Sequence, residues 1–193
     1  MILVIDALRR RQFASDLAAM YYQRKTEFAD RSNPATAHQE FDSYDCLPDT
    51  MYLLAKDSIH TPLLASIRVL MTTGPHLMRD LYPVSYRAIL PFGPHIWEVS
   101  RFCTAPGVGG RGKRLGLLWE IICGVMETAM TYGVHQVIFA ADQALLPLAL
   151  ECGWVARAIG PTMTHGSHEV TAVVAAITPD GLRNVRDRHN VPG

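Results

Sequence analysis

The sequence predicts a single mixed α/β domain, with a mixed sheet flanked by helices, over residues 1–193. Its 193 residues, 49% of them hydrophobic, suit one domain with a sizeable core. Apolar residues recur at three- and four-residue steps over 115–132 and stop at Gly133, which predicts a long amphipathic helix. Directly before it, the run 95–103 has the composition of a strand, and further short apolar segments lie on both sides.

The first half alternates strand, helix and hairpin signals. Residues 1–5 form an apolar strand, and the apolar face of residues 10–28 predicts a helix. Residues 29–50 are polar and contain prolines, so we expect a long loop or lid there. The apolar segments 51–55 and 63–72 predict a hairpin.

The second half continues the same alternation. One or two short helices interrupted by Pro83 are expected before the strand 95–103. The remaining strands are expected at 137–140, 155–159 and 169–177, and a further helix at 145–151. The tail from Thr178 is polar, and we expect it to be loose.

Composition excludes several classes of function. Eighteen basic and eighteen acidic residues leave no net basic field for nucleic acid. The four cysteines have no CxxC spacing and the eight histidines no ligand cluster, so neither disulfides nor a metal site is expected. No apolar run is long enough to cross a membrane, and the first residues do not resemble a signal peptide. We therefore expect a cytoplasmic protein.

Charged residues stand inside predicted strands. Glu98 and Arg101 lie three residues apart in the strand 95–103, and Arg68 lies in the middle of the strand 63–72. A buried unpaired charge is costly, so mutual pairing of these three is the economical explanation. An edge strand with one wet face is the alternative for Arg68. Asp42 and Asp45 end the predicted lid, where a solvated loop is the simpler interpretation.

A glycine-rich turn follows the charged strand and opens the long helix. Gly107, Gly109, Gly110 and Gly112 are interleaved with Arg111, Lys113 and Arg114. Cations at a helix N-terminus are unfavourable unless an anion binds there, which indicates a phosphate or phosphopantetheine cradle. A flexible loop with solvated cations is the alternative. The turn matches neither the dinucleotide-binding fingerprint nor the P-loop.

A set of these residues resembles one known family over about residues 8–165. The pattern consists of Arg24-x-x-x-Phe28, Glu40-Phe-Asp42-x-x-Asp45, Tyr52-Leu-Leu, Arg68, Trp97-Glu98-x-Ser100-Arg101-Phe102 and Gly153-Trp154. It is similar to the acyl-homoserine lactone synthases, the LuxI-type autoinducer synthases. The segment Trp97-Glu98-x-Ser100-Arg101-Phe102 is the most specific part of the resemblance.

The resemblance implies a fold like that of the GNAT N-acyltransferases, with a splayed central strand. It implies transfer of an acyl chain from acyl carrier protein or coenzyme A to the amine of S-adenosylmethionine. Lactonisation then releases methylthioadenosine. It further implies that S-adenosylmethionine and the acyl thioester are substrates and that no cofactor is used. We expect the chain to be a monomer or weak dimer.

The resemblance also implies roles for individual residues. Glu98 is the favoured general base, acting through water, and Asp45 is its competitor. Arg68, Arg101 and Ser100 complete the expected catalytic group. The expected substrate-binding residues are Arg24, Phe28, Asp42, Tyr82 and Phe102. We expect Arg111, Lys113 and Arg114 to bind the donor's phosphopantetheine or its carrier protein. Arg9, Arg10 and Arg11 could extend the same basic surface.

Two positions depart from the family pattern. Pro34 replaces a tryptophan of the lid, and Tyr82 replaces a phenylalanine. The first departure supports an alternative function, an N-acyl amino acid synthase or another GNAT-type acyltransferase that acts on a different amine. A degenerate ligand-binding regulator is the non-enzymatic alternative.

Overall fold

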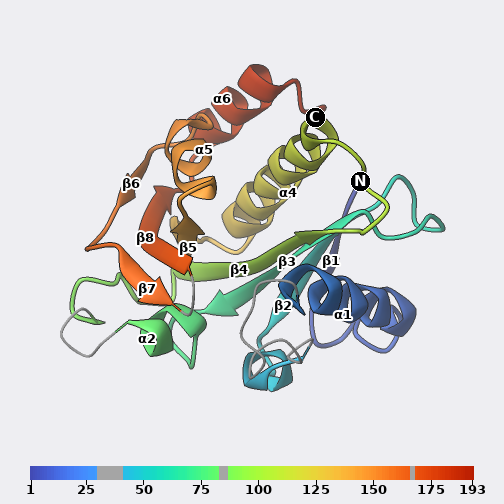
Figure 1. Cartoon of the computed structure of the whole chain (residues 1–193), viewed down its shortest axis with the longest axis horizontal. Coiled ribbons are helices and arrows are strands. Elements are labelled where there is room, and N and C mark those ends of the chain that lie inside the picture. Colours follow the sequence, from blue (N-terminus) through green and yellow to red (C-terminus); the bar gives the residue numbers. More distant parts are fainter. Residues whose placement is uncertain (30–40, 83–86, 166–167) are drawn as a thin grey trace.

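The computed structural model describes residues 1–29, 41–82, 87–165 and 168–193. Within these residues, eight strands form one sheet in the order β1-β2-β3-β4-β5-β8-β6, and β7 pairs with β8 (Figure 1). Strands β4 and β5 run parallel, whereas the other strand pairs of the described residues are antiparallel. The mixed α/β fold that the sequence predicts is confirmed.

Most of the predicted strands and helices are present with similar bounds, whereas β7, the turn η1 and α6 were not predicted. The strands are β1 (Ile2–Ile5), β2 (Met51–Ala55), β3 (Ala65–Met71), β4 (Ile96–Thr104), β5 (Gln136–Asp142), β6 (Ala156–Ala158), β7 (Met163–His165) and β8 (His168–Ala176). The helices are α1 (Ala14–Ala29), the 3-10 turn η1 (Ser43–Cys46), α2 (Leu77–Leu81), α4 (Arg111–Thr131), α5 (Leu145–Glu151) and α6 (Pro179–His189). The predicted hairpin is β2 and β3, paired from Met51↔Val69 to Ala55↔Ala65.

The long helix α4 covers one face of the sheet, with α5 and α6 on the same side (Figure 1). Alternation along β2 sends Leu53 into the core beneath α4, while Tyr52 and Leu54 join a second cluster on the other face. The core residue Ile121 of α4 has no exposed surface. Burial of this apolar stripe is what holds α4 against the sheet.

The opposite face carries α1 and α2 (Figure 1). Under α1, apolar side chains of β1 and β2 pack against Leu17 and Met20. Next to α2, Met78 and Tyr82 pack against side chains of β5 and β8. The inner strands β3 and β4 lie between these two clusters, and there the buried side chains of this face include Arg68 and Glu98.

The prediction of a loose tail from Thr178 is wrong. Residues 179–189 form α6, whose Leu182 and Val185 are buried against α4. Thr178 caps the helix, since its side chain accepts a hydrogen bond from the backbone N–H of Gly181 at 3.0 Å. Asn190 ends it in a left-handed conformation, with φ of 53°. Two buried apolar side chains are too few to reveal the helix in a polar sequence.

Two helix starts also differ from the prediction. Helix α1 begins at Ala14, four residues after the expected start. Arg10 lies in the turns before the helix, where its guanidinium donates to the carbonyls of Leu47 and Thr50, both at 2.9 Å. Helix α4 begins at Arg111, four residues before the expected start. None of the described helices is long and apolar enough to cross a membrane.

Candidate active site

The backbone of β4 is irregular at the charged segment. In its pairing with β3, Arg68 faces Ser100 and Ser66 faces Cys103, so two residues of β4 oppose the single residue Ile67. This is a β-bulge, and Arg101 within it has a φ of 61°, in the left-handed region that non-glycine residues rarely adopt.

Strands β4 and β5 part next to this bulge. Their pairing runs from Ile96↔Gln136 to Glu98↔Ile138, although both strands continue beyond it. The splayed central strand implied by the family resemblance is therefore present. Glu98 lies at the point where the two strands separate.

A network of carboxylates and arginines covers β3 and β4 beside Glu98. Asp45 accepts hydrogen bonds from Arg24 Nη1 at 2.9 Å and from Arg68 Nη1 at 3.2 Å. Asp42 accepts from Arg68 Nη1 at 2.5 Å and from Arg101 Nη2 at 3.0 Å. The network joins α1, the turn η1 and the strands β3 and β4, so residues far apart in the sequence meet here.

The turn η1 presents the two carboxylates together. The side chain of Asp42 caps the turn by accepting from the N–H of Tyr44, and Asp45 Oδ2 accepts from the N–H of Asp42 at 2.9 Å. Burial alone would raise the pKa of Asp45, but Arg24, Arg68 and the Asp42 N–H outweigh it and hold that pKa below its ordinary value. Asp45 is therefore ionised, and both of its oxygens accept hydrogen bonds.

Glu98 has a different environment from the two aspartates. It is fully buried, and this burial raises its pKa to about 7, against the opposing effects of the Met78 N–H and the Arg68 charge. Met78 N donates to Glu98 Oε2 at 2.6 Å. The oxygen Oε1 is buried and has no hydrogen-bond partner among the described residues, although the Ser100 hydroxyl lies close enough to favour the charged form.

The predicted mutual pairing of Glu98 with the strand arginines is wrong. Among the described residues, Arg68 forms ion pairs with Asp42 and Asp45, and Arg101 forms an ion pair with Asp42. Glu98 instead accepts a hydrogen bond from the backbone of α2. The alternative of an edge strand with a wet face is also wrong, since Arg68 has no exposed surface and β3 is an inner strand. Ser100 accepts a hydrogen bond from Arg68 Nε at 3.2 Å.

The other predicted substrate-binding residues divide into three cases. Tyr82 follows α2 and is buried next to Met78, and this burial raises the pKa of its phenol. Phe102 is half-buried and packs against the core on the α4 face, so its side chain points away from Glu98. The side chain of Phe28 and the whole of Pro34 lie outside the described part of the structure.

Two tyrosines without a role in the sequence analysis also lie at this site. Tyr52 donates from its hydroxyl to Asp45 at 2.9 Å, and the Tyr44 ring lies 5.3 Å from the Arg68 guanidinium. Tyr52 lies directly opposite Arg68 in the hairpin of β2 and β3. Strand alternation would have placed the two side chains on the same face once the register of the hairpin was known.

A cavity of about 580 Å³ lies at the glycine-rich turn. It is lined by Pro106, Val108, Gly109, Gly110, Arg111, Arg114 and Leu115. The N-cap of α4, Gly110, offers no side-chain hydrogen bond to the first turn of the helix, and that turn contains no acidic residue. The helix N-terminus and two arginines therefore face a space that an anionic group can enter. Lys113 is exposed and does not line the cavity.

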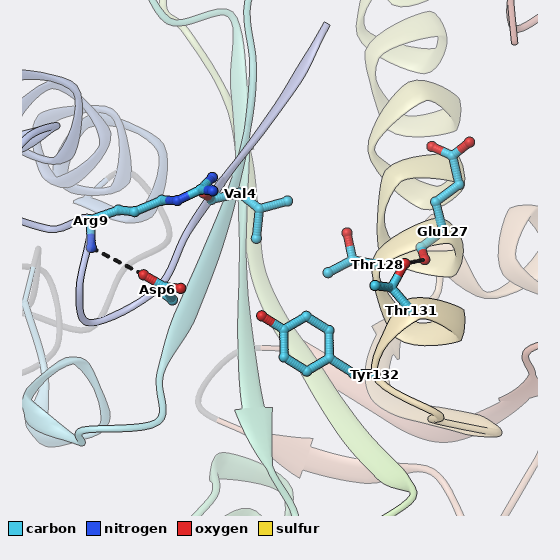
Figure 2. Close-up of a pocket in the computed structure, with 7 residues that line it drawn as sticks. All are labelled: Val4, Asp6, Arg9, Glu127, Thr128, Thr131 and Tyr132. Carbon is cyan, nitrogen blue, oxygen red and sulfur yellow. Dashed lines mark hydrogen bonds between the residues drawn. The ribbon is translucent and has the colours of Figure 1, made fainter.

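Two of the arginines near the N-terminus, Arg9 and Arg10, do not extend the basic surface at the start of α4. Arg9 lines a separate cavity of about 270 Å³ at the last turns of α4, together with Thr128 and Tyr132 (Figure 2). With 21 residues in α4, that cavity lies about 30 Å along the helix from Arg111. The Arg10 guanidinium donates its hydrogen bonds to the backbone carbonyls of Leu47 and Thr50.

The cavity in Figure 2 has few polar groups left to bind a ligand. Thr128 and Thr131 donate to carbonyls of their own helix, and Glu127 pairs with Arg186. No group of three or more potential metal ligands occurs among the residues that the structure describes. The network around Glu98 is therefore the better candidate for the active site.

The splayed strand, the buried Glu98 and the cavity at the start of α4 suit an acyltransferase with a GNAT-like fold. An acyl-CoA N-acyltransferase from Pseudomonas aeruginosa superposes with a TM-score of 0.63 at 16% identity, over 90% of this chain and 97% of that chain, which shows the shared fold. MesI, a CoA-dependent acyl-homoserine lactone synthase, has the same fold, with a TM-score of 0.83 at 22% identity over 100% and 97%.

More specific similarities identify the family. The family model for autoinducer synthases matches residues 8–184. An acyl-homoserine-lactone synthase of Pseudomonas aeruginosa is 29% identical over 176 residues, or 89% of this chain and 88% of that protein. The CoA-dependent acyl-homoserine lactone synthase BjaI, solved with SAM and isopentyl-CoA, has a TM-score of 0.82 at 25% identity, over 100% of this chain and 90% of that chain.

The chain therefore belongs to the autoinducer synthase family, and its activity is that of an acyl-homoserine-lactone synthase.

Proposed function

We propose that this chain transfers an acyl group from a thioester to the amine of S-adenosylmethionine at Glu98, and then closes the homoserine lactone. The observation that carries the proposal is a fully buried glutamate whose pKa is raised to about 7, next to a largely buried network of two aspartates and three arginines. A base with a pKa near the working pH suits the removal of a proton from an ammonium group.

The aspartate–arginine network suits the charges of S-adenosylmethionine. The arginines can pair with its carboxylate, and the aspartates with its ammonium and sulfonium groups. Asp42 is the more accessible acid, with 9% of its side chain exposed, whereas Asp45 is fully buried. We therefore assign substrate contact to Asp42 and to Arg101, which is 21% exposed, and assign the holding of that geometry to Asp45, Arg24 and Arg68.

Glu98 is a better general base than Asp45. Asp45 has a lowered pKa, and both of its oxygens accept hydrogen bonds. Glu98 keeps a buried oxygen without a partner among the described residues, at the point where β4 and β5 separate. That oxygen can take the proton of the amine directly or through one water molecule.

The reaction then proceeds in two balanced steps. In the first, Glu98 takes one proton from the ammonium group, the amine nitrogen bonds to the thioester carbon, and the carbon–sulfur bond breaks. The second proton lost by the nitrogen goes to the sulfur, so the donor leaves as a thiol, and Glu98 later returns its proton to water. In the second, a carboxylate oxygen of the methionine moiety attacks its own γ-carbon, and the sulfonium leaves as neutral methylthioadenosine. Ser100 and the backbone of the bulge at Arg101 line the splay that receives the donor.

The cavity at the start of α4 is proposed to hold the donor's phosphate groups. Arg111, Arg114 and the N–H groups of the first turn supply the positive charge, and Lys113 lies beside them on the surface. A phosphopantetheine arm occurs on both coenzyme A and acyl carrier protein, so both are candidate donors. We expect the chain to act in the cytoplasm as a monomer or weak dimer, and size-exclusion chromatography checks the oligomeric state.

The direct test is release of methylthioadenosine from S-adenosylmethionine, with matched acyl-CoA and acyl-carrier-protein donors of several chain lengths. Release with only one donor class identifies the donor, and mass spectrometry of the lactone identifies the acyl chain. Acylation of another amine without methylthioadenosine release would refute the synthase and support an N-acyl amino acid synthase. If Glu98→Ala leaves the function in cells intact, the chain is a binding protein instead.

A further inference from the structure

Tyr44 connects the two halves of the candidate site. Its backbone belongs to the turn η1: its N–H donates to Asp42 at 3.1 Å, and its carbonyl accepts from the Thr50 hydroxyl at 2.5 Å. Its side chain leaves this turn and reaches α2, where its hydroxyl donates to Asp80 Oδ2 at 2.5 Å.

A contact with Arg68 fixes the side chain between these two ends. The Arg68 guanidinium lies 5.3 Å from the centre of the Tyr44 ring, within the range of a cation–π interaction. Burial raises the pKa of the Tyr44 phenol, and the hydrogen bond to Asp80 and the nearby carboxylates Glu98 and Asp42 raise it further. The phenol therefore stays protonated and donates its hydrogen bond throughout the working pH range.

Helix α2 in turn holds Glu98. Asp80 lies two residues after Met78, whose N–H donates to Glu98 Oε2. The position of this short helix therefore decides whether the base is hydrogen-bonded. The hydrogen bond from Tyr44 ties the same helix to η1.

We propose that Tyr44 is a positioning residue, which ties the carboxylates that bind the amine to the helix that holds the base Glu98. This inference rests on the proposed function for its catalytic consequence, but the link between Tyr44 and α2 is independent of it. Without the hydroxyl, α2 is held by the packing of Met78 and Tyr82 without its tie to η1, and Glu98 more often loses the N–H that favours its charged form.

The groups that face Glu98 determine the direction of the effect. They are Arg68 from β3, Ser100 from β4, the N–H groups of Leu77 and Met78 from α2, and Tyr44 from η1. Loss of the α2 N–H groups removes stabilisation of the carboxylate while the burial remains. The base then titrates at a higher pH.

The experiment compares Tyr44→Phe with the wild type and with Tyr22→Phe, which removes the hydroxyl of an exposed tyrosine of α1. The first readout is hydrogen exchange of the Met78 amide without substrate. The second is the pH profile of kcat for methylthioadenosine release, with the KM for S-adenosylmethionine. Asp80→Ala removes the acceptor instead of the donor, and Asp80→Asn keeps an acceptor oxygen.

In Tyr44→Phe and in Asp80→Ala, we expect exchange at Met78 to become about fivefold to tenfold faster, the effect of one lost hydrogen bond. The acidic limb of the kcat profile moves to higher pH, and the KM for S-adenosylmethionine stays within about twofold, because the ring remains over Arg68. Asp80→Asn and Tyr22→Phe behave like the wild type.

Unchanged Met78 exchange in both folded variants overturns the proposal. So does a raised KM with an unmoved pH limb, because the hydroxyl would then contact the substrate. If the wild-type protein releases no methylthioadenosine, the proposed function fails, while the exchange measurement still decides whether Tyr44 holds α2.

Discussion

Glu98 should weaken the fold at neutral pH while making the reaction possible. Its pKa is raised from 4.5 to about 7 by burial. Each pKa unit corresponds to about 1.4 kcal/mol, so the ionised carboxylate costs the folded protein about 3 kcal/mol. The native state binds the proton more tightly than the unfolded state between these two pKa values. The free energy of unfolding therefore falls as the pH rises from about 4.5 to about 7.

Glu98→Gln removes this titration and keeps the shape of the side chain. The amide oxygen of the variant can still accept from the Met78 N–H, so the hydrogen bond to α2 is retained. We expect the variant to be more stable than the wild type at about pH 8 by up to about 3 kcal/mol, and of similar stability at about pH 4.5. Its turnover should fall by about 10²-fold to 10⁴-fold, because the general base is lost.

Urea unfolding of both proteins across the pH range measures the first effect, and methylthioadenosine release measures the second. The amide of the Glu98→Gln variant cannot titrate, so the difference between the two stability curves reports Glu98 alone. Parallel curves from about pH 4.5 to about pH 8 would show that the pKa of Glu98 is not raised, and turnover close to that of the wild type would exclude Glu98 as the base.

Three substitutions elsewhere test the network, the packing and the donor site. Asp45→Asn leaves the buried Arg24 and Arg68 without their shared charge, so the free energy of unfolding should fall by about 3 kcal/mol in urea titrations; an unchanged midpoint would contradict this. Gly153→Ala should lower the stability by about 2 kcal/mol or more in thermal unfolding, because φ is 129° and the new Cβ would lie 2.8 Å from the Val185 nitrogen; an unchanged Tm would exclude this packing. Arg111→Ala should raise the KM for the acyl donor about tenfold and leave that for S-adenosylmethionine unchanged; the opposite pattern would place the donor elsewhere.

Local pattern was sufficient wherever an element buries a regular stripe. The apolar repeat of α4 and the hairpin of β2 and β3 were predicted because periodicity depends on near neighbours along the chain. The same reasoning missed α6, since Leu182 and Val185 are its apolar anchor in an otherwise polar segment. Its stability comes from docking on α4, which no local pattern contains.

The amino-acid sequence alone was enough to select the charges of the candidate site, because Arg68 and Glu98 stand in segments too apolar for solvated charges, and the motif around Glu98 resembles that of one family. Their pairing was set by the three-dimensional fold. The bulge in β4 turns Arg101 toward Asp42, and α2 brings a backbone N–H to Glu98. An ion pair needs two side chains within about 4 Å, and that distance depends on the register and packing of strands far apart in the chain. Glu98 is thereby left near Arg68 with no ion pair of its own among the described residues, which is why burial can raise its pKa to about 7.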